Sequence, residues 1–219
     1  MTTLKRANSN RIYFFDQNDQ NQFFQNTLKE FIYFLKFKGV HSNIDFSYSH
    51  FDDTLHCHLS IKDNFILDSI PTSLIKDSEI NLVEFIKSLQ NHHLKELIFK
   101  LGDLKQPISQ LSKEQKKLTS IIKVILSQSQ YLFLDNPDEL ISKEDLDQVK
   151  KCIRYEVKNN NRIVLIKSKR KILWPEIVTN IVSKDENRNY VDSPNPLFEN
   201  EPEHKTSHSY SFTLNKKVS

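Results

Sequence analysis

Residues 111–137, LSKEQKKLTSIIKVILSQSQYLFLDNP, place an amphipathic helix directly before a short apolar strand. Ser112 and Gln115 have the spacing of a capping box, which predicts where the helix begins. Residues 131–134 form a continuous apolar run, typical of a strand that is covered on both faces of a parallel sheet. A chain that contains this unit is expected to fold as layers of helices packed on a sheet.

Strand and helix patterns alternate along the rest of the chain. We expect one largely parallel sheet in which 11–15, 131–134 and 162–166 are neighbours, with a helical lobe formed by about 80–105. Further candidate strands and helices are at 44–48, 177–182, 28–35 and 144–158.

The chain divides by composition into a long first part and a polar end. Residues 1–190 are predicted to form one α/β domain, with a helical subdomain at about 65–112. Residues 191–219 are rich in Ser, Asn, Pro and Glu and are predicted to be a flexible tail, with a short candidate strand at 210–214.

Charge and cysteine content exclude several classes of protein. The net charge of +3 is too small to indicate nucleic-acid binding or direct membrane binding. Cys57 and Cys152 lie far apart, as expected of reduced thiols in a cytoplasmic protein. No apolar run has the roughly 18 residues of a membrane span, and the first residues lack the apolar segment of a secretory signal.

Glycine is scarce in this chain. Gly39 and Gly102 are its 2 glycines, whereas average usage of about 7% would give roughly fifteen. A backbone loop that cradles phosphate needs closely spaced glycines, because the chain must adopt positive φ and approach the ligand. The sequence therefore argues against a phosphate-binding loop.

The helix and strand of 111–137 resemble the signature helix and Walker B strand of ABC-type ATPase nucleotide-binding domains. In that family the pattern is roughly LSGGQ, a helix, four apolar residues and Asp-Glu-Pro. The segments 58–66, 94–112 and 163–171 resemble other family segments in the same order, so the resemblance covers about residues 44–188. It implies a P-loop NTPase-like fold with a helical subdomain. Because about ten residues precede Arg11, the resemblance further implies that the family's N-terminal β-subdomain is expected to be missing or reduced.

The departures from the family pattern fall on the positions that bind and hydrolyse ATP in that family. The signature positions are Leu111, Ser112, Lys113, Glu114 and Gln115, with two charged residues in place of the glycines. The Walker B positions are Asp135 and Asn136, so an amide replaces the catalytic carboxylate. Gln22 and Phe23 stand at the phosphate-loop lysine and hydroxyl positions, and Ser168 or Lys169 stands at the switch-histidine position.

Two clusters outside these motifs have other interpretations. His56, Cys57 and His58 would place two histidines on one face of a strand, but without a second pair of ligands we expect no metal site. The basic run Lys167–Lys171 after a strand is typical of a solvated loop, and contact with anionic lipid or nucleic acid is the alternative. Asp135 without phosphate partners is expected to be structural.

The resemblance implies a non-catalytic ABC-ATPase-like subunit, with an ABC permease or an active ABC ATPase subunit as partner. Such a chain needs no cofactor and lies at the inner face of the cytoplasmic membrane through its partner. The groove between the sheet and the helical lobe, beside residues 50–64, would hold the partner, with Phe51 and Phe65 as anchors. The alternatives are a divergent but active subunit that binds ATP and magnesium, and an unrelated α/β protein-interaction domain.

Overall fold

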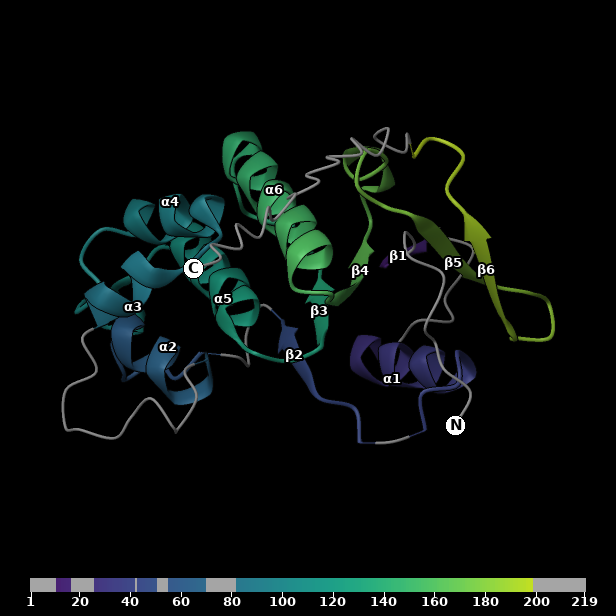
Figure 1. The fold of residues 1–219 in the computed structure, drawn as a ribbon, viewed down its shortest axis with the longest axis horizontal. Helices are drawn as coiled ribbons and strands as arrows, with labels where there is room; N and C mark the ends of the chain where they lie inside the picture. The colour runs from purple at the N-terminus through teal and green to yellow at the C-terminus, as the bar shows by residue number, and fades with distance from the viewer. Residues whose placement is uncertain (1–10, 17–25, 42, 51–54, 70–81, 199–219) are drawn as a thin grey trace, which may run out of the picture.

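The computed structural model describes residues 11–16, 26–41, 43–50, 55–69 and 82–198. Its centre is a six-stranded sheet in the order β2-β3-β4-β1-β5-β6, in which all neighbours are parallel except β5 and β6. The predicted adjacency of the three central strands is confirmed (Figure 1). The strands are β1 Ile12–Asp16, β2 Phe46–Ser49, β3 Tyr131–Asp135, β4 Ile163–Ser168, β5 Asn180–Lys184 and β6 Tyr190–Pro194.

Helices cover both faces of this sheet, so the predicted α/β layers are confirmed. Helix α1 lies on one face, while α5 and α6 lie on the other, and α2, α3 and α4 form a lobe beside α5 and α6 (Figure 1). The helices are α1 Thr27–Phe37, α2 Ile61–Ser69, α3 Leu82–Ser88, α4 His92–Lys100, α5 Lys113–Leu126 and α6 Lys143–Asn159.

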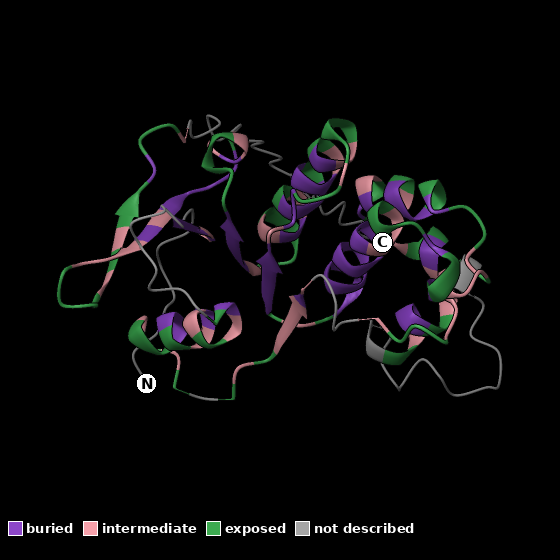
Figure 2. Ribbon diagram, turned by 180° about the vertical axis from the view of Figure 1, so that it is seen from behind, coloured by how far each residue is buried: buried purple, intermediate pink, exposed green. Residues whose placement is uncertain are grey.

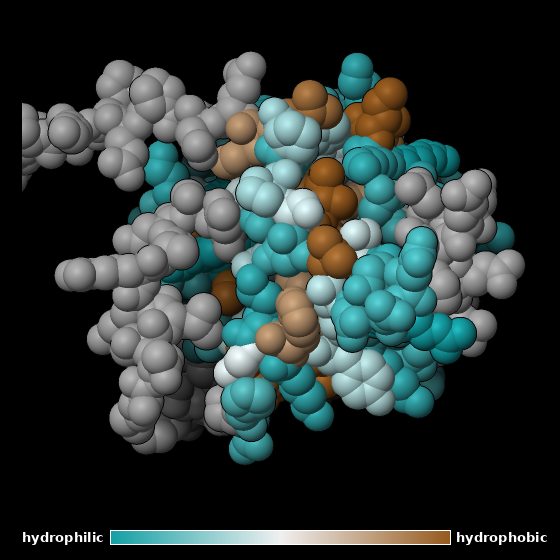
Figure 3. All heavy atoms as spheres, turned by 90° about the vertical axis from the view of Figure 1, so that its right-hand side faces the viewer, coloured by the Kyte–Doolittle hydropathy of each residue, from teal (hydrophilic) through white to brown (hydrophobic). Residues whose placement is uncertain are grey.

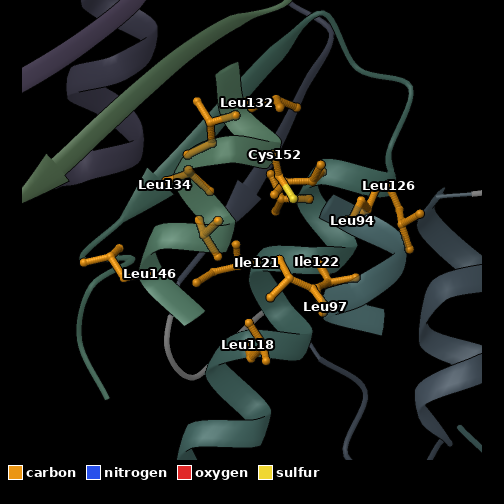
Figure 4. Close-up of a cluster of buried hydrophobic side chains, with 14 of the residues drawn as sticks. Leu94, Leu97, Leu118, Ile121, Ile122, Leu126, Leu132, Leu134, Leu146 and Cys152 are labelled. Atoms are coloured by element: carbon orange, nitrogen blue, oxygen red, sulfur yellow. The ribbon is translucent and has the colours of Figure 1, made fainter. Parts of the chain in front are cut away.

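The core consists of two clusters separated by the sheet. Alternate strand residues point to opposite faces, so Leu132 and Leu134 of β3 pack toward α5 and α6 while Tyr131 and Phe133 pack toward α1. Figure 4 shows leucines and isoleucines from the lobe, α5 and β3 converging around Cys152 of α6. Figure 2 shows that the central strands and the inner sides of these helices are buried.

Both glycines end helices. Gly39 follows α1 with φ of 86° and Gly102 follows α4 with φ of 78°. A glycine just after a helix adopts this left-handed conformation without a steric penalty. Each of the two glycines therefore terminates a helix.

Three predicted boundaries differ from the structure. The helical segment predicted at about 80–105 is divided, because α3 ends at Ser88 and Asn91 caps a new helix, α4, by accepting a hydrogen bond from the Leu94 backbone N–H at 3.2 Å. The strand predicted at 177–182 begins three residues later, at Asn180. The predicted domain end at residue 190 falls inside strand β6, so an ordered strand begins the segment predicted as a tail. The candidate strand at 210–214 lies outside the described residues.

Candidate functional site

The carboxyl ends of β1, β2, β3 and β4 meet at one edge of the sheet, where ligands usually bind in parallel α/β folds. Asp135 ends β3, and Lys167 is its Cα partner on β4. Both side chains follow the alternation that points Phe133 and Leu165 toward α1. Each of the two residues is 6% exposed. The edge therefore holds a buried carboxylate and a buried ammonium side by side.

The carboxylate of Asp135 is held by neighbouring polar groups. Its Oδ2 accepts a hydrogen bond from the Tyr48 hydroxyl at 3.2 Å and lies 3.8 Å from Nε2 of His50. Its Oδ1 accepts a hydrogen bond from Nδ2 of Asn136 at 2.9 Å. The hydrogen-bond donors to the Asp135 carboxylate in these two bonds are side chains, those of Tyr48 and Asn136.

Asn136, which the sequence analysis aligns with the family's catalytic carboxylate, turns its amide toward Asp135. Its φ of 45° lies in the left-handed region, which asparagine tolerates better than most residues. Its backbone N–H donates to the carbonyl of Lys167 at 2.7 Å, which ties the end of β3 to β4. The Asn136 side chain is therefore a hydrogen-bond donor to the Asp135 carboxylate.

Lys167 reaches from β4 to the beginning of α1. Its ammonium donates a hydrogen bond to the hydroxyl of Thr27, the first residue of that helix. Burial lowers the pKa of Lys167, and the negative charges of Asp135 and Glu30 act against this shift. The interpretation of Lys167 as part of a solvated loop is wrong, because this residue lies inside the strand.

The start of α1 stands at the position expected of a phosphate loop. Gln22 and Phe23 lie outside the described residues. The helix begins at Thr27, and Asn26 caps it by accepting a hydrogen bond from the Lys29 backbone N–H at 3.0 Å. Asn26 and Thr27 therefore open the helix, a role that the sequence alone did not assign to them.

The signature residues form the start of α5. The Ser112 hydroxyl accepts from the Gln115 N–H at 3.2 Å, and the Gln115 side chain accepts from the Ser112 N–H at 3.0 Å, so the predicted capping box is present. Leu111 is buried, whereas Lys113 and Glu114 are exposed. A hydrogen bond with Ser112 is the main reason why the pKa of Glu114 is lowered. Ser112 therefore caps the N-terminus of its own helix, α5.

One turn into α5, Lys117 connects this helix to the Walker B position. Its side chain is 1% exposed, and its ammonium donates to the backbone carbonyl of Asp135 at 2.8 Å. On the adjacent strand β2, Ser49 pairs with Ser120 of α5 at 2.9 Å between hydroxyl oxygens. Helix α5 therefore holds the end of β3 through Lys117 and the end of β2 through Ser120.

The switch position forms a tight turn after β4. Ser168 is buried, and its hydroxyl accepts from the Arg170 N–H at 2.9 Å, while Lys169 is exposed. Lys171 pairs with Asp16 at 2.8 Å across the end of β1. The basic run is therefore partly neutralised by the protein itself.

Two of the other candidate features are placed differently from the predictions. Residues 56–58 lie in a turn rather than a strand, and the described residues hold no group of three potential metal ligands. Phe65 is 0% exposed and belongs to the protein's own core, so its predicted role as an anchor for a partner is wrong. Phe51 lies outside the described residues.

The surface away from the carboxyl edge carries hydrophobic side chains as well. On the face that includes β6, hydrophobic patches alternate with hydrophilic side chains (Figure 3). An apolar pocket of about 460 Å³ is lined by Phe14, Ile172, Trp174, Val178, Ile181 and Leu197, among others.

Comparison with solved structures places this fold among known proteins. The ATP-binding subunit of an ABC transporter superposes with a TM-score of 0.59 at 14% identity, covering 84% of this chain and 78% of that one. The fold is that of an ABC-type ATPase domain. No protein-family model matches the sequence, and no curated protein matches it. At this identity the likeness establishes the fold.

Other matches have the same architecture in larger or related chains. CbiO1 from Clostridium perfringens, part of the ABC transporter complex cbiONQ, gives a TM-score of 0.52 at 15% identity over 84% of this chain and 77% of that chain. The archaeal ribosome recycling factor aABCE1 gives 0.57 at 12% identity over 83% of this chain. The present chain spans 34% of the length of that recycling factor.

Proposed function

We propose that this chain is a non-catalytic ABC-ATPase-like subunit that acts as a structural or regulatory partner in an ABC transporter-type membrane complex. The observation that carries the proposal is how the side chains interact at the carboxyl edge of the sheet, around Asp135. Asn136 donates its amide to Asp135, and the Lys167 ammonium reaches the first residue of α1. Groups of the chain itself thus interact where a nucleotide and its metal ion would have to bind.

Three further features support this proposal. Asn136 supplies no carboxylate to act as a base toward water. Both glycines are used at helix ends, and neither belongs to a phosphate loop. Glu114 places a negative charge in the first turn of α5, and this charge disfavours binding of a phosphate at the N-terminus of that helix.

The proposed partners are an ABC permease, an active ABC ATPase subunit, or both. Among the described residues, no helix is both long enough and apolar enough to cross a bilayer. Similar chains include a putative metal-chelate type ABC transporter, with a TM-score of 0.53 at 14% identity over 85% of this chain and 72% of that chain. In our proposal this chain therefore reaches the inner face of the cytoplasmic membrane through a partner.

The helical lobe offers a partner an exposed apolar residue. Leu67 of α2 is 58% exposed, next to Phe65, which is buried in the core. Leu67 lies on α2, three residues beyond the segment 50–64 that the sequence analysis places beside the docking groove. We assign to Leu67 the anchoring role that Phe65 is too buried to perform.

We expect no ATP binding by the purified chain at millimolar nucleotide, that is, less than about 4 kcal/mol of binding free energy. The reason is that the described edge is filled by internal contacts of Asp135 and Lys167. Isothermal titration calorimetry with ATP and magnesium checks this, with an active ABC ATPase domain as positive control. Micromolar affinity that disappears in Asp135→Asn would contradict the proposal.

We expect Leu67→Asp to reduce co-purification with membrane proteins at least about tenfold, because loss of a buried apolar anchor in an interface commonly removes 2 kcal/mol or more. The tagged full-length chain is purified from native membranes and the bound proteins are quantified. Ile172→Asp is the matched control, since Ile172 is 86% exposed and lines the apolar pocket, outside the lobe. Circular dichroism establishes equal folding. Equal recovery of partners with Leu67→Asp and wild type would argue against this docking site.

One observation favours a second candidate function, a divergent active subunit. His50 brings an imidazole to 3.8 Å from Asp135, and Lys167 brings an ammonium to the start of α1. These two groups supply a base and a cation of the kind used in phosphate chemistry. Phosphate release that tracks with the purified protein and is lost in Asp135→Asn would support this candidate over the first.

A further inference from the structure

A charged pair is buried at the carboxyl edge of the sheet. Asp135 and Lys167 are directly opposed on adjacent parallel strands, whose spacing is about 4.8 Å. Both point toward the face covered by α1, and both are 6% exposed. Burying a carboxylate without a counter-charge is strongly unfavourable. Lys167 is therefore placed to supply a counter-charge for the Asp135 carboxylate, although the two residues belong to different strands.

The Lys167 ammonium has one hydrogen-bonded hydroxyl and is influenced by two carboxylates. Its ammonium donates to the Thr27 hydroxyl. The negative charges of Asp135 and of Glu30 on α1 act on Lys167 favourably, while the positive charge of Lys169 opposes them. Carboxylate and hydroxyl oxygens are the ligands that hard divalent cations such as Mg²⁺ prefer. The same oxygens would therefore attract a metal ion if the ammonium were absent.

We propose that the Lys167 ammonium is an internal counter-ion that occupies the oxygen-lined position between Asp135 and the first turn of α1, and that it excludes divalent cations from this position. The chain supplies this charge from β4, so the edge stays folded without magnesium. This inference concerns the cation balance of one site, and it does not depend on the proposed membrane partner or on nucleotide binding.

The test is to remove the ammonium and measure the response to magnesium. Lys167→Met keeps an unbranched apolar side chain and deletes the charge. We expect the thermal midpoint of wild type to change by less than about 1 °C in about 10 mM MgCl₂, relative to NaCl of equal ionic strength. We expect Lys167→Met to have a lower midpoint in NaCl and to regain about 2–4 °C in MgCl₂, because a cation that binds the folded state stabilises it.

Two controls separate this effect from general charge effects. Lys169→Met removes an exposed lysine two residues away and is expected to leave the magnesium response at the wild-type level. Lys167→Met combined with Asp135→Asn removes the carboxylate too and is expected to abolish the response. The proposal is overturned if wild type and Lys167→Met respond equally, or if the double variant still responds.

If Lys167→Met does not fold, Lys167→Gln replaces it, and wild type provides an independent measurement. Binding of Mn²⁺ to wild type is followed by the paramagnetic relaxation of water protons. Absence of binding at millimolar Mn²⁺ supports the proposal. Binding to wild type that is lost in Asp135→Asn overturns it, because the ammonium would then not exclude the cation.

Discussion

Phe133→Ala is expected to lower the free energy of unfolding by about 3–5 kcal/mol, the range for removing a buried aromatic side chain. Phe133 is 0% exposed in the middle of β3. Its ring stacks on Phe46 of β2 with centroids 4.9 Å apart and lies 5.1 Å from the ring of Phe31 on α1. The substitution therefore opens a cavity where two strands and a helix meet. Urea unfolding followed by circular dichroism measures the change.

The matched control for this substitution is Phe99→Ala on α4. Phe99 is 68% exposed, so its removal is expected to change the free energy of unfolding by no more than about 0.5 kcal/mol. Equal effects of the two substitutions, or a loss below about 1 kcal/mol for Phe133→Ala, would show that β3 is not the centre of the packed sheet.

Much of the sheet could be predicted because its signals are local. The apolar run 131–134 is short and continuous, which is the pattern of a strand buried on both faces. The helix before it begins at a capping box whose two partners are three residues apart, Ser112 and Gln115. Since helix and strand must then pack on each other, the α/β layers follow from these two features.

The buried lysine could not be predicted, because its environment is made by distant segments. In the sequence, Lys167 precedes Ser168, Lys169 and Arg170 and looks like the beginning of a polar loop. Its burial depends on Thr27, which is 140 residues away and accepts its hydrogen bond. One signal was available. Lys167 is two residues after Leu165 in β4, so both side chains point to the same face of the sheet, and Leu165 faces α1.

The last strand was missed for a similar reason. Tyr190–Pro194 has the composition of a polar tail, and β6 is stabilised by its partners rather than by an apolar face. Asp192 accepts a hydrogen bond from Asn180 of β5 at 2.7 Å and pairs with Lys38 after α1 at 2.7 Å. The Tyr190 hydroxyl donates to the Glu30 carboxylate at 2.6 Å. These contacts join segments that sequence periodicity does not relate to each other.

The site residues hold the carboxyl edge of the sheet together. Asp135, Asn136 and Lys167 are bound to one another or to neighbouring elements, so each contributes to the stability of the edge. In our proposal, selection on such a chain acts through its surfaces, and the docking test at Leu67 addresses this directly. The magnesium test at Lys167 addresses the edge, so the two outcomes are separable.

Glu156→Ala is expected to lower the free energy of unfolding by about 3–5 kcal/mol, the range for breaking a buried ion pair by removing one partner. Glu156 of α6 is 3% exposed and lies 3.4 Å from the guanidinium of Arg162. Its carboxylate also accepts hydrogen bonds from Asn91 at 2.9 Å and from Asn160 at 2.6 Å. Burial lowers the pKa of Arg162 and Glu156 opposes this shift, so the substitution leaves a largely buried guanidinium without its carboxylate.

The effect of Glu156→Ala extends to the helical lobe, because Asn91 caps α4 and is attached to α6 through this carboxylate. Amide hydrogen exchange in α4 is therefore expected to accelerate together with the loss of global stability. Glu144→Ala is the control on the same helix, since Glu144 is exposed in its first turn and is expected to change stability by no more than about 0.5 kcal/mol. Unfolding in urea measures both variants. A loss below about 1 kcal/mol for Glu156→Ala, with unchanged exchange in α4, would mean that this carboxylate does not hold the lobe to the sheet domain.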